Sequence, residues 1–127
     1  MTRKLDGLEL TTSPKPLVQE VDAILVCVPD DHALESAMQA EDGALEGARA
    51  GQVLINFSTV SPDASRALAD KAARQKLRYV EAPMSGSTPE AETGELVILA
   101  GGSEDDIRAA APILDVVGRK TILDLAT

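Results

Sequence analysis

The stretch V-D-A-I-L-V-C-V, residues 21–28, is a continuous run of aliphatic and β-branched side chains. A run without polar alternation is typical of a strand that is covered on both faces, as in a parallel sheet. Pro29-Asp30-Asp31 ends the run and can cap a helix over residues 31–40. The stretch therefore predicts one strand–helix unit of an α/β fold.

The same alternation of strand and helix patterns continues toward the C-terminus. Ser61-Pro62-Asp63 combines an N-cap serine, a proline at the first helical position and an acidic first turn. Strands alternating with helices across short loops predict an α/β domain with a mainly parallel sheet of about five strands. Further strands are predicted at 51–58, 77–80, 95–100 and 120–125, and helices at 62–75 and from Ser103 to Gly118.

Length, charge and composition narrow the class of protein. The 127 residues predict a single domain. A net charge of −9 argues against nucleic acid and anionic membranes as partners, because both attract basic surfaces. The single cysteine, Cys27, lies in an apolar run and is predicted to be a buried structural thiol. His32 is the only histidine, so we expect no metal site. No signal segment opens the sequence, so we expect a soluble, cytoplasmic protein.

Polar loops follow three of the predicted strands, namely Pro29-Asp30, Ser58-Thr59 and Ser85-Gly86-Ser87. Ligands of open α/β sheets bind outside the carboxyl ends of the strands, so these loops form a candidate site. Ser58-Thr59 either starts a helix or contacts a carboxamide, ribose or anion at the helix N-terminus. Ser85-Gly86 either forms a turn or holds a carboxylate.

Taken in order, these motifs resemble those of the β-hydroxyacid dehydrogenases, which include 3-hydroxyisobutyrate, tartronate semialdehyde and 6-phosphogluconate dehydrogenases. The similarity spans residues 7–124. It rests on A-I-L-V-C-V-P (23–29), G-Q-V-L-I-N-F-S-T-V-S-P (51–62), E-A-P-M-S-G-S (81–87) and A-E-T-G-E-L-V-I-L-A-G-G (91–102).

The resemblance implies a Rossmann-type domain that binds NAD or NADP and takes part in hydride transfer with a small 3-hydroxy acid. It implies a substrate-carboxylate loop at Ser85 and Gly86, with Ser87 where a second glycine is usual. It implies cofactor contacts from four residues: Val28, Pro29, Ser58 and Thr59.

Two parts of the family pattern have no counterpart in residues 1–127. The strand with G-x-G-x-x-G, which holds the pyrophosphate, is missing, so the domain is expected to lack its first βαβ unit. The catalytic lysine and the helical dimerisation domain are also missing, and Lys76 and Lys120 match no catalytic motif. We therefore expect a truncated family member that is inactive alone.

The missing first strand would lie against residues 21–28 in the family's sheet order, and residues 8–12 would form an outer strand without its neighbour. An unpaired apolar edge favours association with another chain. We expect either a homo-oligomer formed through residues 21–28 or a rearranged N-terminus that covers this edge. The alternative function is a non-catalytic domain that binds a small anion or a protein and self-associates; a fragment without its own function is a third possibility.

Overall fold

A computed structural model describes residues 3–5, 8–10, 13–85, 97–117 and 120–124. The main sheet has six strands in the order β3-β4-β5-β7-β6, with β8 paired to β7. The pairs β3–β4, β4–β5 and β7–β8 are parallel, whereas β7 runs antiparallel to β5 and β6, which confirms the predicted mainly parallel α/β sheet. Its strands are β3 (Ala23–Val26), β4 (Val53–Asn56), β5 (Arg78–Glu81), β6 (Met84–Ser85), β7 (Val97–Gly101) and β8 (Lys120–Asp124).

Three of the helices begin where local capping predicts. Asp30 accepts a hydrogen bond from the Ala33 N–H at 2.8 Å, and Ser61 accepts one from the Ala64 N–H at 3.1 Å. Ser103 caps the last helix in the same way. The helices are α1 (Pro14–Val18), α2 (Asp31–Gln39), α3 (Ala44–Gly47), α4 (Pro62–Arg74) and α6 (Glu104–Val117).

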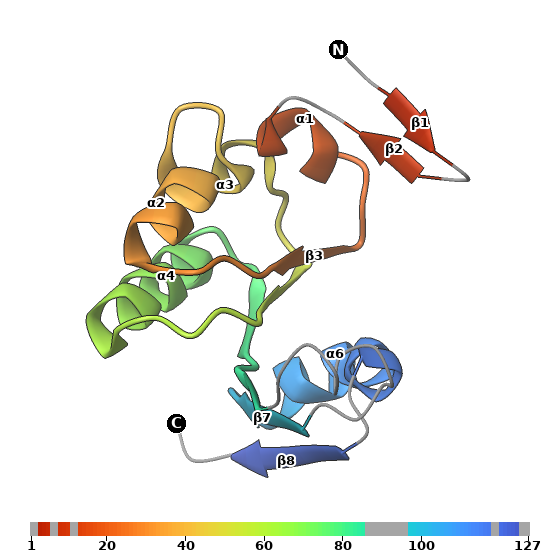
Figure 1. Cartoon of the computed structure of the whole chain (residues 1–127), viewed down its shortest axis with the longest axis vertical. Helices are drawn as coiled ribbons and strands as arrows, with labels where there is room; N and C mark the ends of the chain where they lie inside the picture. Colours follow the sequence, from red (N-terminus) through yellow and green to blue (C-terminus); the bar gives the residue numbers. More distant parts are fainter. Residues whose placement is uncertain (1–2, 6–7, 11–12, 86–96, 118–119, 125–127) are drawn as a thin grey trace.

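Two apolar clusters lie on opposite faces of the sheet, and β4 contributes to both. Leu54 belongs to the cluster under α2 and α4, whereas its neighbour Ile55 belongs to the cluster under α6. Successive side chains of a strand point to opposite faces, so β4 is covered on both. Figure 1 shows α2 and α4 together on one side of the sheet and α6 on the other.

Strand β3 is at the end of the sheet order and is covered on one face only. Ile24 and Val26 are buried in the cluster under α2 and α4, whereas Leu25, on the opposite face, is 49% exposed. Helix α6 contacts β4, β5, β7 and β8.

The prediction that Cys27 is buried was wrong. Cys27 is exposed, because the apolar run typical of a central strand here forms an edge strand.

The N-terminal segment forms a separate antiparallel pair of strands, β1 (Arg3–Leu5) and β2 (Leu8–Leu10) (Figure 1). The expected strand at residues 8–12 is thus present as β2, but the expectation that it has no neighbour was wrong. Among the described strands, neither β1 nor β2 pairs with β3. Helix α1 instead packs on α3, where a side chain at Gly47 would collide with the Lys15 carbonyl oxygen.

Candidate functional site

The loops that follow β3, β4 and β5 leave the sheet side by side. Backbone pairing continues one residue past the strands, because the Phe57 N–H donates to the Val26 carbonyl at 2.8 Å. The Ala82 N–H likewise donates to the Asn56 carbonyl at 2.8 Å. The carboxyl ends of the three parallel strands therefore form one edge, which is where ligands bind to open α/β sheets.

Ser58 and Thr59 have different environments at this edge. Ser58 is buried, and its hydroxyl accepts a hydrogen bond from the Val28 N–H at 2.9 Å. Its own N–H donates to Oδ1 of Asn56 at 2.9 Å. Thr59 is exposed, and its hydroxyl has no hydrogen-bond partner among the described residues. Ser58 thus holds the loop after β3 in place, whereas Thr59 presents a hydroxyl to solvent.

The first turns of α2 and α4 are joined across the same edge. The Asp31 carboxylate accepts a hydrogen bond from the Ser61 N–H at 2.8 Å. Hydrogen bonds from the Ser61 hydroxyl and N–H lower the pKa of Asp31. Pro29 is exposed just before the start of α2, and Val28 is partly buried. The loop from Val28 to Asp31 is therefore fixed at both ends, by Ser58 and by Ser61.

Asn56 extends the hydrogen-bond network under the site and was not among the residues predicted from the sequence. Its amide donates to the Tyr79 hydroxyl at 3.3 Å, and burial raises the pKa of Tyr79. Near this hydroxyl, Ser65 of α4 donates to the carboxylate of Glu81, which is therefore held by the helix. A polar residue in the otherwise apolar run V-L-I-N was the available signal for Asn56.

The predicted substrate loop is described only in part. Ser85 is in β6, where it pairs with Val97 of β7. β6 follows β5 after two residues and continues the same register against β7. Gly86 and Ser87 lie outside the described residues. The structure thus brings Val28, Pro29, Ser58 and Thr59 together, and it places Ser85 beyond the carboxyl end of β5, on the same side of the sheet.

Neither a metal cluster nor a membrane helix is found in the part of the chain that the structure describes. No group of three or more His, Cys, Asp or Glu side chains within it could hold a metal ion. No helix within it has the length and apolar character needed to span a bilayer.

The chain matches a family model over almost its whole length. Residues 2–125 match the NAD binding domain of 6-phosphogluconate dehydrogenase. The chain belongs to this family. The predicted resemblance and the Rossmann-type fold are therefore confirmed. The family binds NAD, and similar solved structures contain NADP+ or NAD+.

Two relatives of the chain are named as dehydrogenases of hydroxy acids. The chain is 37% identical over 113 residues to 2-(hydroxymethyl)glutarate dehydrogenase of Eubacterium barkeri, covering 89% of this chain and 38% of that protein. It is 28% identical over 116 residues to mitochondrial 3-hydroxyisobutyrate dehydrogenase of Homo sapiens, covering 91% of this chain and 34% of that protein. The chain spans less than half the length of either relative.

A solved structure has a similar fold. The 3-hydroxyisobutyrate dehydrogenase of Mycobacterium tuberculosis, in a structure with L-serine, superposes with a TM-score of 0.82 at 26% identity. The match covers 89% of this chain and 38% of that one.

The described residues fit one side of a dinucleotide. Thr59 offers an exposed hydroxyl, and the fixed backbone from Val28 to Pro29 lies next to it at the carboxyl edge. Residues 1–127 contain no G-x-G-x-x-G to hold a pyrophosphate. The described residues therefore offer a hydroxyl and a fixed backbone, without a pyrophosphate-binding loop, at the edge where dinucleotides bind to open α/β sheets.

Proposed function

We propose that residues 1–127 form a single domain, the later half of an NAD(P)-binding domain in an oxidoreductase of small 3-hydroxy acids. The observation that carries this proposal is the paired arrangement of Ser58 and Thr59. The buried Ser58 fixes the loop after β3, and the adjacent Thr59 presents its hydroxyl at the carboxyl edge. In this function Val28, Pro29, Ser58 and Thr59 contact the cofactor, and Ser85, Gly86 and Ser87 contact the substrate carboxylate.

The bound cofactor would exchange a hydride with the hydroxyl-bearing carbon of the substrate. Residues 1–127 would bind and orient the reactants without supplying the proton transfer. Lys76 is in the turn after α4, at the amino end of β5, and Lys120 is at the amino end of β8. Lys76 lies away from the carboxyl edge, and neither lysine matches the catalytic motif of the family, so we expect no turnover from these residues alone.

Calorimetric titration with NAD+ and NADP+, with and without a small 3-hydroxy acid, tests the proposal. We expect saturable binding that Thr59→Ala weakens about tenfold, since one hydrogen bond to the ligand is lost. Ser36→Ala is the matched control, because Ser36 is exposed on α2, outside the carboxyl-edge loops, and loses a hydroxyl in the same way. Absence of binding at millimolar nucleotide would contradict the proposal, and equal effects of the two variants would exclude a contact from Thr59.

The second candidate function is a non-catalytic binding domain that self-associates through residues 21–28. The exposed edge of β3 favours it, since β3 pairs only with β4 among the described strands. Light scattering at several protein concentrations tests this candidate, for which a dimer is the expected result and a monomer would contradict it. The cytoplasmic location also stays a prediction.

A further inference from the structure

We propose that Asn56 is a positioning residue for the cofactor: its buried amide fixes the loop at Ser58-Thr59 and, through Ser58, the loop at Val28-Pro29. This inference rests on the proposed function, in which both loops contact NAD or NADP. Asn56 is only 2% exposed, so it would affect nucleotide binding through the backbone that it holds and not by touching the ligand.

Asn56 is the last residue of β4 and the only polar residue of that strand, V-L-I-N. A buried amide costs folding free energy unless its oxygen and its nitrogen both find hydrogen-bond partners. Oδ1 accepts a hydrogen bond from the Ser58 N–H at 2.9 Å, and Nδ2 donates to the Tyr79 hydroxyl at 3.3 Å. An aliphatic residue would fill this place without needing either partner. The amide therefore indicates a role beyond packing.

The hydrogen bond from the Ser58 N–H closes a local turn where the chain leaves the sheet. An asparagine side chain bonded to the backbone two residues further on fixes the direction of the chain there. After this turn Ser58 is buried and Thr59 is exposed. The buried Ser58 hydroxyl then accepts from the Val28 N–H at 2.9 Å. One amide thus fixes two neighbouring loops.

Tyr79 of β5 determines which way the amide of Asn56 faces. Because the Tyr79 hydroxyl is the acceptor for Nδ2, the amide oxygen is directed at the Ser58 N–H. Ser65 of α4 and Glu81 of β5, which hydrogen-bond to each other, lie beside the same hydroxyl. The amide is therefore oriented by neighbours on two elements.

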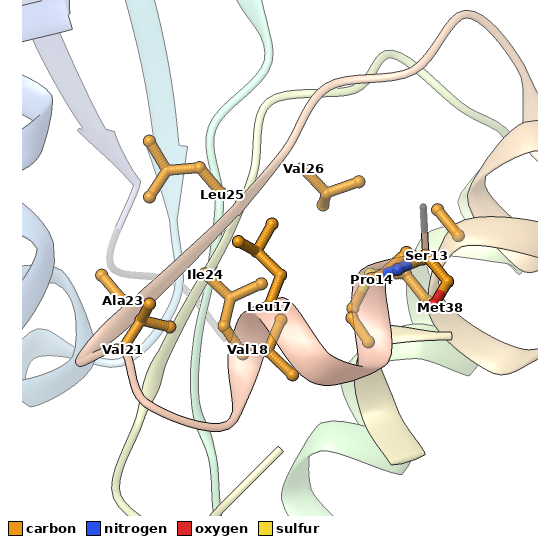
Figure 2. Close-up of a pocket in the computed structure, with 12 residues that line it drawn as sticks. Ser13, Pro14, Leu17, Val18, Val21, Ala23, Ile24, Leu25, Val26 and Met38 are labelled. Atoms are coloured by element: carbon orange, nitrogen blue, oxygen red, sulfur yellow. The ribbon is translucent and has the colours of Figure 1, made fainter. Parts of the chain in front are cut away.

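The loop at Val28-Pro29 depends on the side of β3 that faces β4. The other side of β3 borders a groove of about 510 Å³, which is lined by the strand and by residues of α1, α2 and α3. Figure 2 shows Ile24 of the strand on the same side as Leu17 of α1. Neither Val28 nor Pro29 lines this groove, and within the described residues their one hydrogen bond is the bond to Ser58.

Gln52 offers a matched control at the other end of β4. Its amide is also buried, at 4% exposed, and Nε2 donates to the carbonyls of Val18 and Val21, both at 2.7 Å. Gln52 precedes β4 and so lies at the amino end of the strand, away from the carboxyl edge. Loss of this amide should affect folding and leave the cofactor loops in place.

Calorimetric titration of the full chain with NAD+ and NADP+ tests the proposal. Asn56→Leu should weaken nucleotide binding about tenfold, because the loops lose the acceptor that fixes them. Gln52→Leu removes a buried amide in the same way and should change the Kd by less than about twofold, since it is distant from the site. Equal weakening by the two variants would overturn the positioning role.

Asn56→Asp tests the chemistry and also covers the case in which Asn56→Leu does not fold. An aspartate keeps an oxygen acceptor for the Ser58 N–H, and the Tyr79 hydroxyl can donate to its second oxygen. Nucleotide binding should therefore stay within about threefold of the unsubstituted chain. A tenfold loss in Asn56→Asp would show that the acceptor does not position the loops, and would overturn the proposal.

Hydrogen exchange measured by NMR needs no ligand and separates the two possible failures. Exchange of the Ser58 and Val28 N–H groups should be about tenfold or more faster in Asn56→Leu than in Gln52→Leu. Faster exchange together with no nucleotide binding by the unsubstituted chain would contradict the proposed function alone. Equal exchange in the two variants would overturn the positioning role of Asn56.

Discussion

The two edges of β3 differ, although the same four residues form both. The closed edge pairs with β4 from Ala23 to Val26 and is held at its two ends by buried side chains. At the amino end, Nε2 of Gln52 donates to the carbonyls of Val18 and Val21, both at 2.7 Å. At the carboxyl end, the Ser58 hydroxyl accepts from the Val28 N–H. The open edge has the groove and no strand within the described residues.

This difference assigns the stability of β3 to its closed edge and the proposed contacts to its open edge. The side chains of Gln52 and Ser58 that hold the two ends of β3 flank β4, so we expect that the open edge can be altered at small cost in folding free energy. The open edge and the loop after β3 also carry the proposed contact with a second copy and the proposed cofactor contact. Substitutions on the two sides of β3 should therefore give opposite results in stability and in binding.

The largest contrast is expected between two neighbouring residues of β3. Ile24→Ala should lower the free energy of unfolding by about 2–4 kcal/mol, because Ile24 is only 6% exposed in the packed cluster. Leu25→Ala should lower it by less than about 1 kcal/mol, because half of its side chain is already in water. Urea unfolding of both variants checks this. Equal losses would show that the face of Leu25 is covered in the isolated chain.

Gln52 should be the next most sensitive position. Gln52→Leu removes the donor to two carbonyls and the acceptor for the Arg49 N–H, which lies 2.5 Å from Oε1. We expect a loss of about 2–3 kcal/mol, since buried polar groups are left without partners. Gln19→Leu serves as the control, because that side chain is exposed. A loss below that of the control would mean that the closed edge does not depend on this amide.

Substitutions of Ser58 and Thr59 should differ in their effect on stability at the carboxyl end of β3. Ser58→Ala should cost about 1–2 kcal/mol and speed hydrogen exchange of the Val28 N–H, which loses its acceptor. Thr59→Ala should change stability by no more than about 0.5 kcal/mol, since Thr59 is exposed. Exchange measured by NMR separates the two variants. Unchanged exchange at Val28 in Ser58→Ala would contradict the holding role of Ser58.

The smallest effect concerns pH and the network below the site. Burial raises the pKa of Tyr79 in the folded chain, so the folded state keeps this proton at a pH where the unfolded state has lost it. The stability from this group is complete below the unfolded pKa of about 10 and is lost as the pH rises through the folded pKa. Tyr79→Phe should flatten stability above pH 10. Because Tyr79 is the only tyrosine and tryptophan is absent, absorbance reports its titration directly, and an ordinary pKa would contradict its burial.

The sequence by itself determined the order of strands and helices and most helix starts. Asp30, Ser61 and Ser103 cap helices through hydrogen bonds within three residues of the cap, so each signal is local and can be read from the chain. The ordered motifs likewise identified the family, and their positions placed Val28, Pro29, Ser58 and Thr59 at one edge. The roles of these four residues as ligand contacts stay predictions.

Only the tertiary structure decided which groups have neighbours. Whether β3 is an inner or an edge strand depends on pairing with residues distant in the chain, so the apolar run alone predicted burial for Cys27, which is exposed. The pairing of β2 with β1, and the contacts of Gln52 and Asn56, have the same origin. Ser58 and Thr59 are adjacent hydroxyl residues. Ser58 has a structural role only because the Val28 N–H lies within hydrogen-bond distance of its hydroxyl. Local patterns determine conformation, whereas the function of a side chain depends on the non-local groups that surround it.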